Sequence, residues 1–168
     1  MAQKFLTQSG GVLQENLPTT TSAGAGDAGK IPGLDSTGRL DMSMMPTGLG
    51  AHTQVITASE ALSAGAFVNI YDNGGSFAVR NADAATGKRA HGFVISAVTS
   101  GGQATVYPDG LNTALTGLTA GDYYLSDSAV GAATKTVPTG TGKMVQRLGA
   151  SMNATTLNCD LGQPIILA

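Results

Sequence analysis

A glycine-rich stretch near the N-terminus has the residue types of a phosphate-binding loop. Residues 24–29 read GAGDAG, which fits the dinucleotide-binding pattern G-x-G-x-x-G, and Lys30 follows, as in a P-loop. Both motifs bind phosphate only where a strand precedes the glycines and a helix N-terminus follows them. Here a Thr/Ser/Pro stretch precedes the glycines, Ile31 occupies the magnesium-binding position, and Pro32 would break a helix. We therefore interpret the stretch as a flexible hinge and expect no bound nucleotide.

The other side chains that could do chemistry are scattered along the chain. His52 and His91 fall in different predicted elements, and we expect both to be partly exposed near the starts of strands. Two histidines and a single cysteine offer no spacing typical of a zinc site. Cys159 has no basic neighbour in the sequence, so we expect it to pack in a strand as a small hydrophobic side chain. No carboxylate pair or nucleophile motif stands out, so we predict no catalytic residue, no metal ligand and no cofactor.

The composition limits the classes of function. The chain has 168 residues, enough for one domain or for a small domain with an appendage. Nine basic and eleven acidic residues give a net charge of −2, which excludes electrostatic nucleic-acid binding as the main activity. No apolar run approaches the roughly 20 residues that span a bilayer, and the N-terminus has no apolar signal sequence. We therefore expect a protein made in the cytoplasm that has neither nucleic acid nor a membrane as its partner.

Two regions of the chain differ in their residue pattern. Residues 1–50 show no sustained strand or helix period and contain a small, polar stretch over 17–29. Such a stretch has too few apolar side chains to offset the entropy lost on ordering it. From residue 52 onward the pattern is that of a β protein, and a hydrophobic content of 42% in the whole chain is enough for a core. We predict an extended N-terminal arm over residues 1–50 and a β-rich body over 52–168.

The body is predicted to be mainly β, as a small antiparallel β-barrel or β-sandwich. Apolar and β-branched runs are separated by turn signals at a spacing of roughly 8–12 residues, which fits both architectures. Asn73-Gly74 predicts one hairpin and Gly101-Gly102 predicts a second. Residues 58–64 are predicted to form a helical turn capped by Ser59. The predicted strands are 53–57, 66–71, 76–80, 91–98, 103–107, 122–126, 143–150, 155–159 and 164–167.

Six apolar residues of the arm are the candidate contact residues. They lie within 30–46, where Pro32-Gly33 and residues 36–38 interrupt any regular element. This segment cannot form a core alone, so it needs a surface to lie on: its own body, sister chains or another protein. Three of the six are methionines, whose flexible side chains adapt to irregular contacts. The candidates are Ile31, Leu34, Leu40, Met42, Met44 and Met45.

Two parts of the sequence resemble structural proteins of tailed bacteriophages. Residues 29–41 read GKIPGLDSTGRLD and are followed by MMP at 44–46, which is similar to a linker of phage tail-fibre and head-fibre proteins. Residues 117–126 (GLTAGDYYLS), 143–149 (KMVQRLG), 154–157 (ATTL) and 164–167 (PIIL) are similar, in the same order, to a β module of phage tail and capsid-associated proteins. The resemblance covers roughly 29–46 and 91–168. The chain has little room for the long repeat shaft or receptor-binding tip of a tail fibre, which favours a capsid decoration (cement) or short head-fibre protein.

The resemblance implies a non-enzymatic virion protein on the outer surface of the capsid. In the tail-fibre and head-fibre proteins with this linker, three chains associate about a common axis, so the expected partners are the major capsid protein and two further copies of the chain, as a homotrimer. The alternative is a short tail-fibre or tail-tip component that recognises the host surface. An enzyme such as a glycan hydrolase is the third class, with no catalytic constellation in its favour. The sequence leaves open whether the protein belongs to the head or the tail and which capsid position it would occupy.

Overall fold

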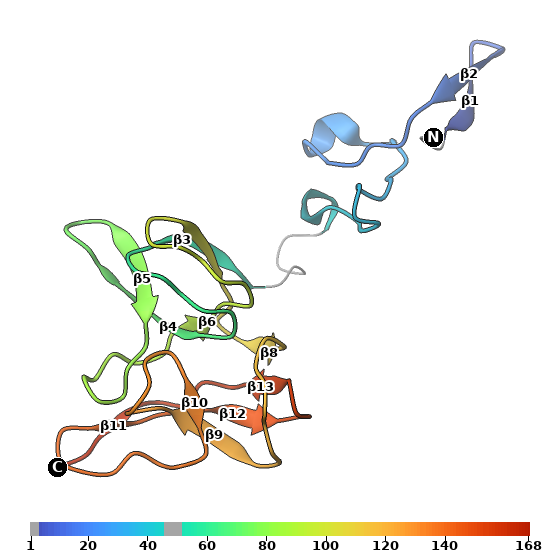
Figure 1. Cartoon of the computed structure of the whole chain (residues 1–168). Helices are drawn as coiled ribbons and strands as arrows, with labels where there is room; N and C mark the ends of the chain where they lie inside the picture. Colours follow the sequence, from blue (N-terminus) through green and yellow to red (C-terminus); the bar gives the residue numbers. More distant parts are fainter. Residues whose placement is uncertain (1–3, 46–51) are drawn as a thin grey trace. The chain divides into compact units, whose positions relative to one another are not determined.

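The chain divides into two compact units, Met1–Ala51 and His52–Ala168 (Figure 1). The computed structural model describes residues 4–45 and 52–168. Pro46 of the linker-like sequence and the predicted end of the arm near residue 50 lie outside the described residues.

The first unit consists of a hairpin and a series of turns. Strands β1 (Phe5–Ser9) and β2 (Val12–Asn16) pair antiparallel across a Gly10-Gly11 turn, and both glycines have positive φ angles, of 60° and 82°. Two short 3-10 helices follow, η1 (Ala25–Asp27) and η2 (Met42–Met44). None of residues 4–45 is buried. The hairpin was not predicted, although two glycines between short apolar runs are a recognised hairpin signal.

The second unit begins with a five-stranded sheet. Its spatial order is β6-β4-β5-β3-β7. The pairs are antiparallel except for β3 and β5, which run parallel and align Thr57 with Ala78. The predicted hairpin at Asn73-Gly74 is confirmed, because it joins β4 to β5. The strands are β3 (Gln54–Ala58), β4 (Phe67–Asp72), β5 (Phe77–Asn81), β6 (Gly92–Phe93) and β7 (Gln103–Val106).

A second five-stranded sheet, antiparallel throughout its described pairs, follows in the sequence. Its spatial order is β10-β9-β12-β13-β8, and a separate two-stranded sheet pairs β11 with β14. Figure 1 shows the two five-stranded sheets as the upper and lower layers of the body. The mainly β fold class with a β body is therefore confirmed. The strands are β8 (Gly110–Asn112), β9 (Asp122–Leu125), β10 (Ala133–Thr134), β11 (Met144–Val145), β12 (Arg147–Ser151), β13 (Leu157–Cys159) and β14 (Ile165–Ile166).

Two clusters of buried side chains stabilise the body. Successive residues of a strand point to opposite faces, and β4 accordingly contributes Phe67 to one cluster and Val68 to the other. The cluster containing Phe67 unites both sheets and includes Phe93, Leu125, Leu148, Leu157 and Cys159. The cluster containing Val68 draws on the first sheet and its connections and includes Ile56, Leu62, Val79, Val94 and Val106.

Two sequence predictions in the first half of the body are wrong. Residues 58–64 do not form a helical turn, because the backbone of Leu62 pairs with Val98 through two bonds of 2.8 Å, as in a β-bridge. The predicted strand 91–98 shortens to β6, and it does not form a hairpin with β7. Instead β6 pairs with β4 and β7 pairs with β3, leaving a single antiparallel bridge between Phe93 and Tyr107.

The predicted strand 143–150 is divided at Gln146. Its buried amide group pairs with Ala90 as a backbone peptide would: Oε1 accepts from Ala90 N (2.8 Å) and Nε2 donates to Ala90 O (3.0 Å). Nε2 also lies 3.2 Å from the carbonyl oxygen of Gly162. This side chain joins the loop before β6 to the second sheet.

Candidate functional site

The six candidate contact residues all lie in the coreless first unit and are accessible. Five of them, Ile31, Leu34, Leu40, Met42 and Met45, have exposed fractions of 39 to 63%, and Met44 is half-buried. No apolar core holds this segment in place, so its shape depends on polar bonds within the unit.

Asp35 closes the loop that carries Leu34 and Leu40. Its backbone N–H donates to Arg39 O (2.7 Å), and its carboxylate oxygen Oδ1 accepts from Thr37 N (2.8 Å), Thr37 Oγ1 (2.7 Å) and Arg39 N (3.0 Å). The hydroxyl and backbone bonds from Thr37 and Arg39 hold the pKa of Asp35 below its usual value. The bond between Asp35 and Arg39 brings Leu34 and Leu40 to the two sides of the loop base.

Asp41 organises the methionines in the same way. It caps η2, where Oδ1 accepts from Ser43 N (2.9 Å) and Ser43 Oγ (2.6 Å), and these bonds lower its pKa. Ser43 Oγ also accepts from Ser22 N (2.7 Å), which ties the turn to a segment 21 residues earlier. Met42 and Met45 are joined by the bond from Met45 N to Met42 O (3.1 Å) at the two ends of this turn.

The glycine-rich stretch is a closed turn and does not form a phosphate cradle. Residues 25–27 form η1, and Asp27 accepts from Ala23 N (2.6 Å). Lys30, the counterpart of the P-loop lysine, pairs with Asp27 at 2.5 Å, and this bond is the main cause of the lowered pKa of Asp27. The carbonyl of the neighbouring Ile31 accepts from Thr19 N (2.9 Å), next to the isolated parallel bridge between Thr19 and Pro32. Because Asp27 holds residues 24–29 with these bonds, the stretch is a locally ordered turn and not the flexible hinge that the sequence predicts.

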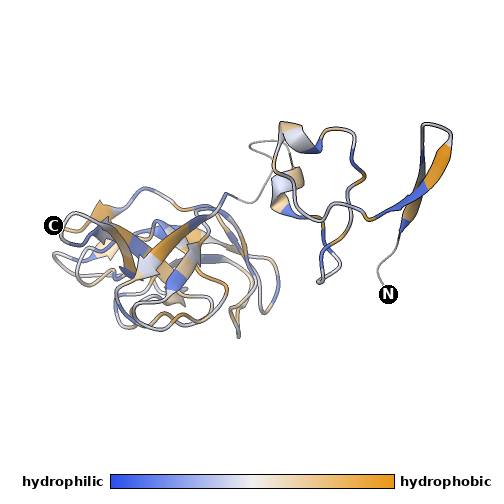
Figure 2. Ribbon diagram, turned by 90° about the horizontal axis from the view of Figure 1, so that it is seen from above, coloured by the Kyte–Doolittle hydropathy of each residue, from blue (hydrophilic) through white to orange (hydrophobic). Residues whose placement is uncertain are grey.

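The hairpin adds exposed apolar residues that the sequence analysis did not single out. Leu6 and Leu13 lie diagonally on one face of β1 and β2, and Val12 lies on the other face. All three are more than half exposed, and Figure 2 colours part of this hairpin as apolar. An isolated two-stranded hairpin is at best marginally stable in water. The hairpin is therefore a second candidate contact region of the first unit.

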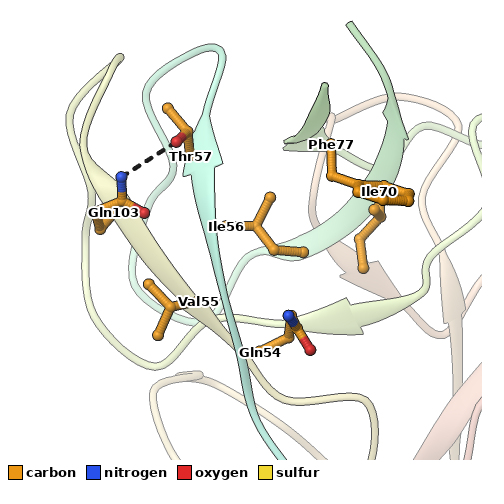
Figure 3. A pocket seen from close by; sticks show the side chains of 7 residues that line it. All are labelled: Gln54, Val55, Ile56, Thr57, Ile70, Phe77 and Gln103. Carbon is orange, nitrogen blue, oxygen red and sulfur yellow. Dashed lines mark hydrogen bonds between the residues drawn. The ribbon is translucent and has the colours of Figure 1, made fainter. Parts of the chain in front are cut away.

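The body has an apolar hollow of about 570 Å³ in the first sheet. Phe77 of β5 stands beside it with an exposed fraction of 81%, unusual for so large an apolar side chain. Gln103 of β7 donates to Thr57 of β3 (3.2 Å) at its side, and Figure 3 shows the lining side chains. The lining residues are Gln54, Val55, Ile56, Thr57, Ile70, Phe77 and Gln103.

The two histidines meet at a second, smaller hollow of about 210 Å³, which shares Gln54 and Ile70 with the first. His52 is exposed and its Nδ1 lies 3.5 Å from Asp109 Oδ2, whereas His91 is half-buried just before β6. Partial exposure near strand starts is therefore confirmed. Within residues 4–45 and 52–168, no group of three or more His, Cys, Asp or Glu side chains is placed to hold a metal ion.

Cys159 packs in the core shared by both sheets, as expected, and burial raises the pKa of its thiol to about 12. At neutral pH this thiol is protonated and a poor nucleophile. In the described part of the chain, no helix has the length and apolar character needed to cross a bilayer.

No family model and no curated protein matches the chain. Among solved structures, the chain matches the N base of the head fibre gp8.5 of bacteriophage phi29, with a TM-score of 0.43 and 16% sequence identity. The match covers 69% of this chain and 92% of that chain. At this TM-score and identity it establishes neither a shared fold nor a shared function.

Proposed function

We propose that the chain is a non-enzymatic structural protein of a tailed-phage virion, a trimeric capsid decoration protein whose first unit attaches to the outer face of the head. One observation carries the proposal: residues 4–45 contain no buried side chain, yet they hold apolar side chains outward in shaped turns. A segment of this kind gains its stability from the surface that covers it.

The polar bonds of the first unit give the arm a shape before it binds. Asp27, Asp35 and Asp41 each accept two or three hydrogen bonds from nearby backbone or side-chain donors. A preorganised contact segment loses less conformational entropy on binding than a fully flexible one. The arm therefore combines adaptable apolar contacts with a defined backbone.

The resemblance to phage proteins falls on identifiable elements of the body. Residues 117–126 contain β9, 143–149 contain β11 and most of β12, and 154–157 and 164–167 lead into β13 and contain β14. The quoted blocks thus supply one whole strand and most of a second strand of the second sheet, reach the first residue of a third, and supply all of the small sheet. This supports the assignment of the body as a phage β module and the expected virion location.

A trimer would let modest contacts add up. Three arms held on one assembly raise the effective concentration of each arm at the capsid once another is bound. The expected solution mass is three times the 16.8 kDa of the chain, measured by light scattering coupled to size-exclusion chromatography. A monomer at all concentrations would contradict the trimer.

Labelling intact particles tests the location. A label on the C-terminus of the protein, imaged by electron microscopy on virions of the phage that encodes it, should decorate the head at regular positions. A label confined to the tail would overturn the decoration assignment. It would make the alternative, a short tail-fibre or tail-tip protein that recognises the host surface, the working hypothesis.

Point variants test the contact surface. The double substitution Leu34→Ser and Met42→Ser should weaken binding of the purified protein to heads that lack it, because both side chains are exposed in the first unit. Leu111→Ser is the matched control, because Leu111 is a similarly exposed leucine of the body. Equal binding by the double variant and the control would show that the 31–45 segment is not the anchor.

A further inference from the structure

Two arginines of the body, Arg80 and Arg89, have no acidic partner in the part of the chain that the structure describes, although other cations of the body form ion pairs. Arg147 binds Asp122 and lies 3.6 Å from Asp160, and Lys143 pairs with Asp127. Among the described residues, no carboxylate lies within ion-pair distance of Arg80 or Arg89. An arginine held in place without a counter-charge is a ready site for an anion.

Arg80 of β5 is positioned by its inner end. Its Nε donates to Asn69 Oδ1 on the neighbouring strand (3.1 Å), and its guanidinium lies over the ring of Tyr71 at 4.0 Å. Asn69 is buried, and its amide nitrogen donates to Arg89 O (2.9 Å). These contacts fix the guanidinium plane and leave its two terminal nitrogens without a hydrogen-bond partner in the described structure.

Arg89 is linked to Arg80 through Asn69 and His91. The Nε of Arg89 lies 2.7 Å from Nε2 of His91, whose Nδ1 accepts from Ile70 N (3.0 Å) and lies 3.4 Å from the Asn69 amide nitrogen. The Nε–H of Arg89 is thus directed at the imidazole, and the two terminal nitrogens of this guanidinium have no hydrogen-bond partner in the described structure. These terminal N–H groups need an acceptor from outside.

The nearest acidic residues in sequence are already occupied. The Asp72 carboxylate accepts from Gly75 N (2.9 Å), and the buried Asp83 accepts from Ala85 N and Thr86 Oγ1. Arg80 and Tyr71 are half-buried and Arg89 is exposed, so the donors are accessible. His91 also lines the smaller hollow, which gives an incoming chain room beside the donors.

We propose that Arg80 and Arg89, positioned by Asn69, Tyr71 and His91, bind carboxylate side chains of an acidic segment of a partner protein. The free ends of a guanidinium match the two oxygens of a carboxylate, and Arg147 with Asp122 is an internal example of this pairing. This arginine site belongs to the body, whereas the six apolar residues belong to the arm. It does not rest on the proposed function, and it gives the body a contact of its own.

The test is an NMR titration of the full chain with an acidic peptide, acetyl-Gly-Asp-Glu-Asp-Gly-amide, and with its neutral Asn/Gln counterpart. We expect saturable shifts of the His91 ring and the Asn69 side-chain amide with the acidic peptide and none with the neutral one. Arg80→Gln and Arg89→Gln should each weaken binding about tenfold, the loss expected for a hydrogen bond between charged groups. Arg80→Lys keeps the positive charge but loses the paired donors of the guanidinium, so it should also weaken binding. The backbone amide spectrum of this variant reports whether the fold is intact.

Lys135→Gln is the matched control, because Lys135 is an exposed cation whose Nζ donates to Ala120 O (2.8 Å). No saturable shift, or equal weakening by Lys135→Gln, would overturn the proposal. Inorganic phosphate is a separate arm of the titration, and phosphate binding at these atoms more tightly than the peptide would also overturn it. Peptide binding by a protein that fails to attach to phage heads would leave the arginine site standing and remove the proposed function.

Discussion

Gln146 holds two distant parts of the body together with one buried amide. The side-chain amide of Gln146 bonds to both the N–H and the carbonyl of Ala90, as a neighbouring backbone peptide would. It also donates to Gly162 O. Its sequence neighbours Val145 and Arg147 indicate only a continuous strand. The role depends on a residue 56 positions away, so it could not be predicted from local pattern. Cys159 was predicted correctly because a small apolar residue in a strand needs no such distant information.

Gln146→Leu should destabilise the body by about 2–4 kcal/mol, because it leaves the buried backbone N–H and carbonyl of Ala90 without partners. Urea unfolding followed by circular dichroism measures the loss. Gln103→Leu is the control, because Gln103 is an exposed glutamine of β7, and it should change the unfolding free energy by less than about 0.5 kcal/mol. Similar losses for both variants would contradict the role of the buried amide.

His91 should make the body less stable as the pH falls from 7 to 5. Burial, followed by the nearby Arg89 charge, lowers the pKa of His91 below its ordinary value of 6.5. The unfolded chain therefore takes up a proton at a higher pH than the folded chain, so stability is full above pH 6.5 and decreases below it. Protonation would also break the bond from Ile70 N to Nδ1.

His91→Asn should flatten this pH dependence, because Asn places an acceptor oxygen near the position of Nδ1 and does not titrate. Denaturant unfolding at pH 7, 6 and 5 is the measurement. His52→Asn is the control and should keep the parent profile, because His52 is exposed. Parallel profiles for His91→Asn and the parent would show that another group controls acid stability.

The strands were more predictable than their pairing. The segments that form β3, β4, β5, β7, β9 and β13 are recognisable as β-branched, apolar or aromatic runs between turn signals. The partner of each strand was not visible. The Gly101-Gly102 turn favoured a local hairpin, whereas β7 pairs with β3, about 50 residues earlier. The short strands β8 and β10 carry too few residues for a period to be recognised.

Gly149 allows β12 and β13 to approach closely. Its φ is 152°, and a Cβ at this position would lie 2.0 Å from Asn158 O. Gly149→Ala should cost about 3 kcal/mol or more, because the backbone of β13 would have to move and the conformation is strained for a side chain. Thermal unfolding is the measurement. Gly87→Ala is the control, since Gly87 has a φ of 71° and open space around it, and a loss equal to that of Gly149→Ala would rule out the close approach as the cause.

At the scale of the whole molecule, the two units differ in their hydrophobic core: the second unit has one, and the described part of the first unit does not. Both buried clusters draw their residues from 56–159, whereas residues 4–45 have none. Composition alone suggested this contrast, because the small polar residues of 17–29 cannot build a core. The shape of the first unit was less predictable. It depends on which donors each aspartate reaches, and Asp41 with Ser43 also involves a link back to Ser22.

A fragment of residues 52–168 should therefore fold alone. We expect its midpoint of thermal unfolding to stay within a few degrees of the full chain, with its amide NMR signals dispersed as in the full chain. The same fragment should no longer attach to phage heads. An unfolded or aggregated fragment would show that the first unit contributes to the core of the body. A fragment that still decorates heads would contradict the role of the first unit as the anchor.

The arm joins the body immediately before β3, and β3 lies inside its sheet between β5 and β7. A pull transmitted along the arm therefore acts along a strand that is hydrogen-bonded on both sides, through the parallel register at Thr57 and the antiparallel register over Gln54–Thr57. Under such a load the bonds on the two flanks are sheared together, whereas an edge strand pulled sideways would peel away one bond at a time. In the proposed role on a phage head, this attachment point would give the body a mechanically resistant tether while the shell beneath it expands.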